Sequence, residues 1–132
     1  MNPIHPQSIF LQIADQIRDA ILVGRYKPGE KIPSVREMAA NLEVNPNTVV
    51  KAYEQLIAGG LIASQLGVGF FVCEGALERV LALRRNIFFK DIVPSIVKEM
   101  HLLHISEEDG TEAIQRSYRS WKEETTDNSK EQ

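Results

Sequence analysis

Side chains that donate hydrogen bonds or carry positive charge gather in one short stretch of the sequence. Arg36 ends in a planar guanidinium that can donate two hydrogen bonds at once, and Lys51 carries a compact charge. Between them stand three short polar side chains, Asn45, Asn47 and Thr48. Groups of these types suit phosphate oxygens and the edges of nucleic-acid bases, so this stretch is a candidate nucleic-acid contact.

Two helix starts would hold these side chains in place. In IPSVREMAANL, Ser34 is suited to cap a helix, and Glu37, three residues later, completes a capping box. A second start follows, where Asn45 can act as the cap and Pro46 occupies the first helical position. The turn between the two helices is Glu43-Val44. Two helices joined by so short a turn predict a helix-turn-helix, whose second helix lies in a DNA major groove.

The rest of the N-terminal half supplies the elements that complete such a motif. The segment SIFLQIADQIRDAILVG has apolar residues at helical spacing and ends at Gly24. Lys31-Ile32, before Pro33, can form only a very short strand, and LIASQLGVGFFV indicates two strands around a glycine-bearing turn. We therefore predict an α+β fold in which residues 1–74 form a winged helix-turn-helix, with three helices and a β-hairpin wing.

The second helix of the motif, from about Pro46 to Ala58, should carry part of the core as well as the candidate contacts. Tyr53 is expected to be a core residue rather than a contact. Gly59-Gly60 supplies a left-handed cap at the end of this helix. The apolar positions expected to face inward are Val49, Ala52, Tyr53, Leu56 and Ile57.

Long helical periodicity characterises residues 75–122 and predicts a region of two helices. Pro94 interrupts the apolar stripe of the first helix and should kink it. The second should begin at Ser106, where the following acidic residues suit the positive end of a helix dipole. Residues 123–132 are polar and are expected to form a flexible tail.

The large apolar residues of this helical region suggest a dimer. Two helices of about 50 residues cannot enclose a sizeable ligand pocket or bury such a stripe within one chain. The stripe should therefore pack against a second copy, and the homodimer would present paired recognition helices to a palindromic operator in double-stranded DNA. A small-molecule effector pocket at the dimer interface is left open. The predicted dimerisation residues are Leu77, Val80, Leu81, Ile87, Phe88, Phe89, Ile92, Ile96 and Trp121.

The composition excludes several classes of protein. Cys73 is the single cysteine, which rules out an internal disulfide, and no N-terminal segment indicates export, so a cytoplasmic protein is expected. No apolar run approaches the roughly 20 residues that span a bilayer, so no membrane role is expected. The formal net charge of −3 counts against a nucleic-acid partner, although the positions of the few cations matter more than their sum.

Catalytic and metal-binding patterns are weak. The sequence has no Ser/His/Asp set, phosphate loop or paired carboxylates with a pocket, so we expect no enzymatic activity and no cofactor. His101 and His104 could share a metal with Glu99 or His5, but their loose spacing favours helix capping or a surface position, and no metal site is predicted. The alternative function is a winged-helix module for protein interaction without DNA binding, which the negative net charge would suit.

Residues 8–72 resemble the GntR family of bacterial transcription regulators. The resemblance is carried by LQIADQIRDAI, PGEKIPSVREMA, VNPNTVVKAYEQL, GLI and GVGFFV, which occur in order at the family's spacing. A tail of only two helices is similar to that of the YtrA-type subfamily. This resemblance implies a homodimeric repressor, often of genes for an ABC transporter.

Each candidate contact in the motif has an expected role. Arg36 should meet a phosphate or a guanine, a position that the resemblance also supports. Lys51 should hold a phosphate, while Asn47 and Thr48 should meet phosphates and base edges. The alternatives are a surface ion pair with Glu37 or Glu43 for Arg36, a solvated position for Lys51, and a purely structural cap for Asn45.

Many members of the family carry arginines where this chain has Pro46 and Val50. Part of the family's usual set of guanine contacts is therefore absent. Specificity should therefore depend on Asn47, on Val50 against thymine methyl groups, and on DNA shape. The wing glycines allow close approach to a minor groove, the alternative being a plain hairpin turn. The predicted DNA-binding residues are Lys31, Arg36, Asn45, Asn47, Thr48, Val50, Lys51, Gln65, Gly67 and Gly69.

Overall fold

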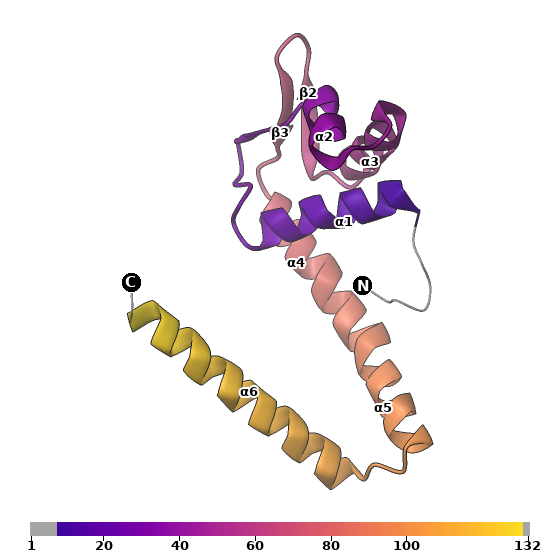
Figure 1. Cartoon of the computed structure of the whole chain (residues 1–132), viewed down its shortest axis with the longest axis vertical. Helices are drawn as coiled ribbons and strands as arrows, with labels where there is room; N and C mark the ends of the chain where they lie inside the picture. The colour runs from indigo at the N-terminus through magenta and orange to yellow at the C-terminus, as the bar shows by residue number, and fades with distance from the viewer. Residues whose placement is uncertain (1–7, 131–132) are drawn as a thin grey trace. The chain divides into compact units, whose positions relative to one another are not determined.

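The computed structural model describes the backbone of residues 8–130 and the side chains of residues 8–125. The chain divides between Asn86 and Ile87 into two compact units. Figure 1 shows the elements, and their order along the chain is α1 (Ile9–Leu22), β1 (Lys31–Ile32), α2 (Val35–Leu42), α3 (Pro46–Ala58), β2 (Ile62–Gln65), β3 (Gly69–Val72), α4 (Ala76–Ile87), the π-helical segment η1 (Phe88–Ile92), α5 (Val93–Leu102) and α6 (Glu107–Lys130).

Both predicted helix starts of the helix-turn-helix are confirmed. At α2 the backbone N–H of Glu37 donates to Ser34 Oγ at 3.1 Å, and the N–H of Ser34 donates to Glu37 Oε1 at 3.4 Å. This reciprocal pair is the capping box. At α3 the side chain of Asn45 caps the helix and Pro46 stands in its first turn, where its missing N–H is not needed.

The turn between α2 and α3 is as short as predicted. Glu43 takes a left-handed conformation with φ +56°, and the N–H of Val44 donates to the carbonyl of Ala39 at 3.0 Å. The end of α3 is also confirmed. Gly60 has φ +71°, and the N–H of Leu61 closes the last turn on the carbonyl of Leu56 at 2.9 Å.

A small antiparallel sheet completes the N-terminal unit. Its strand order is β1-β3-β2, so the very short β1 pairs with the hairpin as predicted. Lys31 lies opposite Phe71, and Gln65 lies opposite Gly69 at the hairpin end. In Figure 1 the hairpin, α2 and α3 lie together above α1. The predicted winged helix-turn-helix is therefore confirmed.

The core of this unit lies between α1, α3 and the sheet. Tyr53 is buried as predicted, and its ring packs edge-on against Phe70 with centroids 4.9 Å apart. The prediction for Ile57 is wrong, because this side chain is 42% exposed. It follows Leu56 by one position and is therefore rotated about 100° around the helix, to the edge of the buried face.

The first turns of α4 belong to the N-terminal unit. Ala76 and Val80 are fully buried in its core, and Leu77 packs against that core. The N-terminal unit covers Val80 completely, so this side chain is not available to a dimer interface, while Leu77 is half-buried and its place in such an interface stays a prediction. Along α4, the first large apolar residue with an exposed side chain is Leu81.

Pro94 does not break the long helix. The chain passes from α4 through η1 into α5, and Pro94 stands in the first turn of α5. The missing N–H of a proline removes one helical hydrogen bond, and the wider turns of a π-helix just before it accommodate that loss. In this segment the N–H of Val93 donates to the carbonyl of Phe88.

The last helix, α6, starts where the sequence predicts. Ser106 Oγ accepts a hydrogen bond from the backbone N–H of Asp109 at 3.1 Å. Gly110 lies so close to Met100 that a Cβ at this position would overlap that side chain. The predicted end of regular structure at Lys122 is wrong, since α6 runs to Lys130. A polar sequence makes burial unfavourable. It does not stop a helix that has already begun and is capped from continuing.

Candidate nucleic-acid interface

The polar side chains of α2 and α3 are presented to solvent. Arg36, in the first turn of α2, is exposed, as are Asn47 and Lys51 on α3, while Thr48 is half-buried. The alternative for Arg36 was a surface ion pair. Among the described side chains no such pair forms, and neighbouring Glu37 is engaged in the capping box. The guanidinium donors of Arg36 are thus available to a ligand.

The first turn of α3 combines a cap with exposed residues. Asn45 Oδ1 accepts a hydrogen bond from the backbone N–H of Asn47 at 2.8 Å. The capping role of Asn45 is therefore confirmed, and its contact with DNA stays a prediction. Val50 is 38% exposed beside Lys51, so an apolar contact and a cation stand next to each other on the outward side of α3.

The wing is a hairpin with a three-residue tip between Gln65 and Gly69. The N–H of Val68 donates to the carbonyl of Gln65 at 2.9 Å, and Gly67 has φ +76°, which favours glycine at this place in the turn. Gln65 and Gly67 are exposed, and Gly69 is half-buried. The predicted wing residues therefore gather at the tip.

Sequence reasoning missed Leu66, which is the most prominent side chain of the wing tip. Leu66 is 99% exposed and Val68 is 49% exposed. An apolar side chain in a three-residue tip has no core to pack against. The signal in the sequence is the presence of a leucine within so short a turn between two strands. Apolar side chains at such a tip suit a minor groove, where they can wedge against base steps.

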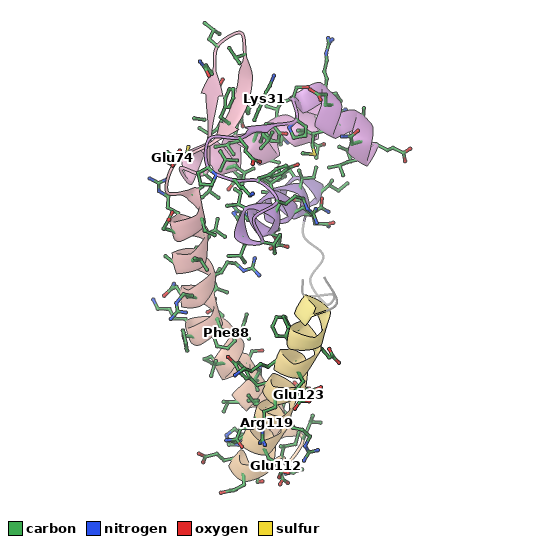
Figure 2. The ribbon with its side chains drawn as sticks, turned by 90° about the vertical axis from the view of Figure 1, so that its left-hand side faces the viewer. Lys31, Glu74, Phe88, Glu112, Arg119 and Glu123 are labelled. Carbon is green, nitrogen blue, oxygen red and sulfur yellow. The ribbon has the colours of Figure 1, made fainter. Side chains whose placement is uncertain are left out.

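The side chain of Lys31, in β1, lies against the wing at Gly69. A Cβ added to Gly69 would lie 2.8 Å from Lys31 Cε, so the lysine stem crosses the glycine closely. Gly69 also has φ +139°, a conformation that side chains disfavour. Figure 2 labels Lys31 beside the hairpin. The absence of a side chain at Gly69 therefore lets a cation lie across the base of the wing tip.

Tyr53 fixes the motif internally. Its hydroxyl donates to the carbonyl of Pro33 at 2.6 Å, which joins α3 to the segment that leads into α2. Burial raises the pKa of the Tyr53 hydroxyl, and nearby Tyr26 and Glu37 raise it further. The side chain is therefore a neutral donor in the folded protein, and its role is to hold the two helices together.

Replacing Tyr53→Phe removes this donor. We expect the free energy of unfolding at neutral pH to fall by about 1 kcal/mol, because the Pro33 carbonyl loses its partner. Because the folded-state pKa of Tyr53 is raised, its contribution is present below about pH 10, where the unfolded tyrosine ionises, and is lost at higher pH. Urea unfolding of both proteins from pH 7 to pH 11 measures this. A stability difference that is the same across that range would contradict it.

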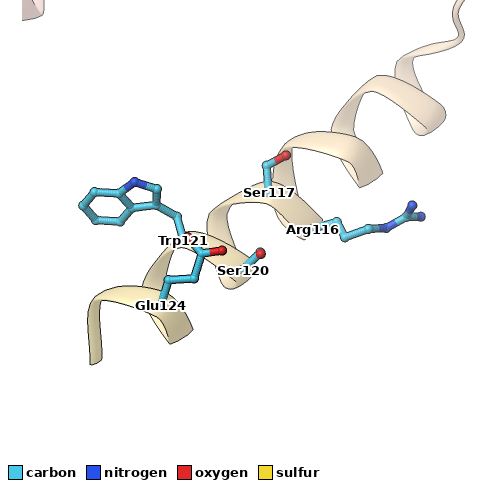
Figure 3. A pocket seen from close by; sticks show the side chains of 5 residues that line it. All are labelled: Arg116, Ser117, Ser120, Trp121 and Glu124. Carbon is cyan, nitrogen blue, oxygen red and sulfur yellow. The ribbon is translucent and has the colours of Figure 1, made fainter. Parts of the chain in front are cut away.

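The depressions found on the described part of α6 are open to solvent, and none of them encloses a ligand cavity. Figure 3 shows one of about 330 Å³, lined by residues of this single helix: Arg116, Ser117, Ser120, Trp121 and Glu124. A single helix cannot enclose a ligand, so this depression is not a site on its own. In the part of the chain that is described, no group of three His, Cys, Asp or Glu residues could hold a metal ion. None of the described helices is long and apolar enough to cross a membrane.

The fold and the exposed residues of α2, α3 and the hairpin define a winged helix-turn-helix protein, a class in which the second helix of the motif lies in a DNA major groove. Residues 10–72 match the family described as "Bacterial regulatory proteins, gntR family". The chain belongs to the GntR family. It is a DNA-binding transcriptional regulator and not an enzyme.

Three known proteins illustrate this relationship. The HTH-type transcriptional repressor YtrA of Bacillus subtilis is 36% identical over 104 residues, which cover 76% of this chain and 79% of that protein. The crystal structure of a GntR-family regulator from Bacteroides thetaiotaomicron has a TM-score of 0.67 at 38% identity, covering 89% of this chain and 99% of that one. The DNA-binding domain of AraR, solved in complex with an operator, has a TM-score of 0.51 at 29% identity and covers 55% of this chain and 90% of its own.

Proposed function

We propose that this regulator is a cytoplasmic homodimeric repressor that binds a palindromic operator through α2, α3 and the wing. The observation that carries the proposal is the exposed apolar face of the second unit. Phe88 and Ile92 are 44% exposed, and Ile96 is 41% exposed. Contiguous apolar surface of this kind marks an association site, and a second copy of the same face is its simplest partner.

The proposed dimer interface is the predicted set without Val80, which the N-terminal unit buries. Most of these side chains are exposed in the single chain, and Leu77 and Ile87 are half-buried. A two-fold axis would bring each side chain against its counterpart or a neighbour, which removes apolar area from water on both copies. The residues are Leu77, Leu81, Ile87, Phe88, Phe89, Ile92, Ile96 and Trp121.

The proposed DNA contacts divide into two kinds. Arg36 and Asn47 would read base edges, with Val50 against thymine methyl groups. Lys31 and Lys51 would neutralise phosphates, which positions the protein without specifying the sequence. The remaining predicted contact residues have uncharged polar side chains or, at the glycines, none, and would let the protein approach the DNA closely: Asn45, Thr48, Gln65, Gly67 and Gly69.

The regulatory role is proposed from the relatives. YtrA of Bacillus subtilis is named a repressor, and this chain is similar to it over most of both lengths. Repression of a transporter-type operon is the role that the subfamily resemblance implies. Each of the depressions on α6 is lined by this single helix, so a small-molecule effector that binds there would need a second copy to enclose it.

The test is a fluorescence-anisotropy titration against tiled fragments of the upstream region of its own gene, repeated at several salt concentrations. We expect one fragment to saturate, with a slope of log affinity against log salt that corresponds to several phosphates. A duplex of the same composition in scrambled order is the control. Equal weak binding to every fragment would contradict the proposal.

A further inference from the structure

Arg79, in the first part of α4, joins that helix to the end of the recognition helix. Its Nη1 donates to the carbonyl of Gly60 at 2.8 Å and to the carbonyl of Glu74 at 3.2 Å. Gly60 is the residue that follows the cap of α3. The carbonyl end of a helix carries partial negative charge, so the cation of Arg79 complements the end of α3.

The guanidinium fits between two glycine turns. A Cβ on Gly60 would lie 3.5 Å from Arg79 Nε, and a Cβ on Gly75 would lie 3.5 Å from Arg79 Nη1. Both glycines have positive φ, +71° and +81°. A side chain at either glycine would thus be in van der Waals contact with the planar head group of Arg79, which donates from a fixed plane in a way that a lysine cannot.

Two further contacts hold the same part of α4 to the N-terminal unit. Ala76 and Val80 are fully buried in the core of that unit. Further along α4, Arg84 Nη1 forms an ion pair with Asp19 Oδ1 of α1 at 2.5 Å. Arg79 adds hydrogen bonds to the backbone at the end of the recognition helix, while the other contacts are core packing and an ion pair with α1.

We propose that Arg79 is a positioning residue that sets the spacing between operator half-sites. The proposal rests on the homodimer proposed above, because a spacing exists only when two recognition helices are joined. The stretch from Arg79 to the end of α4 is about 12 Å long at the helical rise. A tilt of about 10° at its base would move the end of α4 by about 2 Å in each copy, or about 4 Å over the dimer, which corresponds to about one base pair of DNA at 3.4 Å.

The test compares Arg79→Met and Arg79→Lys with the unaltered full chain. The probes are its operator, the same operator with the spacer changed by one or two base pairs, and a duplex with one half-site. We expect the unaltered dimer to lose about tenfold or more in affinity on the wrong spacers, and Arg79→Met to discriminate by less than about threefold. Affinity for the single half-site should stay within about twofold, because Arg79 does not lie on the reading surface.

Arg79→Lys keeps the charge without the planar fork and should give intermediate spacing discrimination. Lys98→Met, which removes one exposed cation from α5, is the control and should behave like the unaltered protein. Spacing discrimination that survives in Arg79→Met would overturn the proposal. So would an equal loss of affinity on every duplex including the half-site, since that would indicate a merely structural role.

A second measurement does not depend on DNA. Amide hydrogen exchange in the first turns of α4 should become about tenfold faster in Arg79→Met, while exchange in α1 stays unchanged. Unchanged exchange in α4 would overturn the anchoring role by itself. If instead the unaltered chain sediments as a monomer or binds no fragment, the homodimeric operator binder of the preceding proposal fails, and the exchange result still decides the contact.

Discussion

Replacing Arg36 and Lys51 together by alanine is expected to abolish operator binding while the fold and the dimer persist. Both side chains are exposed, and no described ion pair or core contact would be lost with them. An arginine that reads a guanine contributes about 1–3 kcal/mol, and a lysine on phosphate contributes about one unit of salt slope. The combined loss should therefore be about 100-fold or more at physiological salt.

The control removes the same two charges elsewhere. Lys98→Ala with Arg119→Ala takes away one exposed cation from α5 and one from α6, and we expect it to bind the operator almost normally. Circular dichroism and sedimentation show whether each variant remains folded and associated. Binding by the Arg36 and Lys51 variant that equals binding by the control would mean that the reading surface lies elsewhere on the protein.

Replacing Ile92 and Ile96 together by glutamate is expected to convert the protein into monomers. The two residues are 44% and 41% exposed and stand one helical turn apart, so they share a face. In a two-fold interface each new carboxylate would be buried without a partner, which costs several kcal/mol. Sedimentation velocity should show the loss of the dimer, and affinity for the full operator should fall by about 100-fold or more while half-site binding is unchanged.

A single substitution, Lys98→Glu, is the matched control for this pair. It makes the same change of two charge units on the same helix, but Lys98 lies with Ser95 on the polar side. We expect it to remain dimeric. If the Ile92 and Ile96 variant also stays dimeric, the interface lies on another surface; if both variants dissociate, total charge rather than this apolar face governs association.

Local signals in the sequence were sufficient for the helix-turn-helix. Ser34 and Glu37 form the predicted capping box, Asn45 caps α3, and Gly60 closes it in the left-handed conformation. Caps and tight turns depend on residues a few positions apart, so their hydrogen bonds can be predicted without knowing what packs nearby. This is why the position of the candidate contacts on α2 and α3 followed from the sequence.

Predictions that depended on a neighbour in space were less successful. Val80 and Phe88 belong to one periodic apolar stripe, yet the first is fully buried in the N-terminal unit and the second is 44% exposed. Periodicity shows the direction of a side chain around its own helix but not which element covers that face. For the same reason Ile57 was wrongly assigned to the core.

The sequence by itself thus determined the identity, order and ends of most elements, and with them the class of protein. Only the tertiary structure decided which contacts join those elements. Arg79 donates to Gly60 across 19 positions of the chain, and Lys31 crosses Gly69 on a neighbouring strand. Contacts of this kind form when segments that are distant in the sequence pack together, so no pattern of adjacent residues predicts them. Their energies depend on distances that exist only in the folded chain.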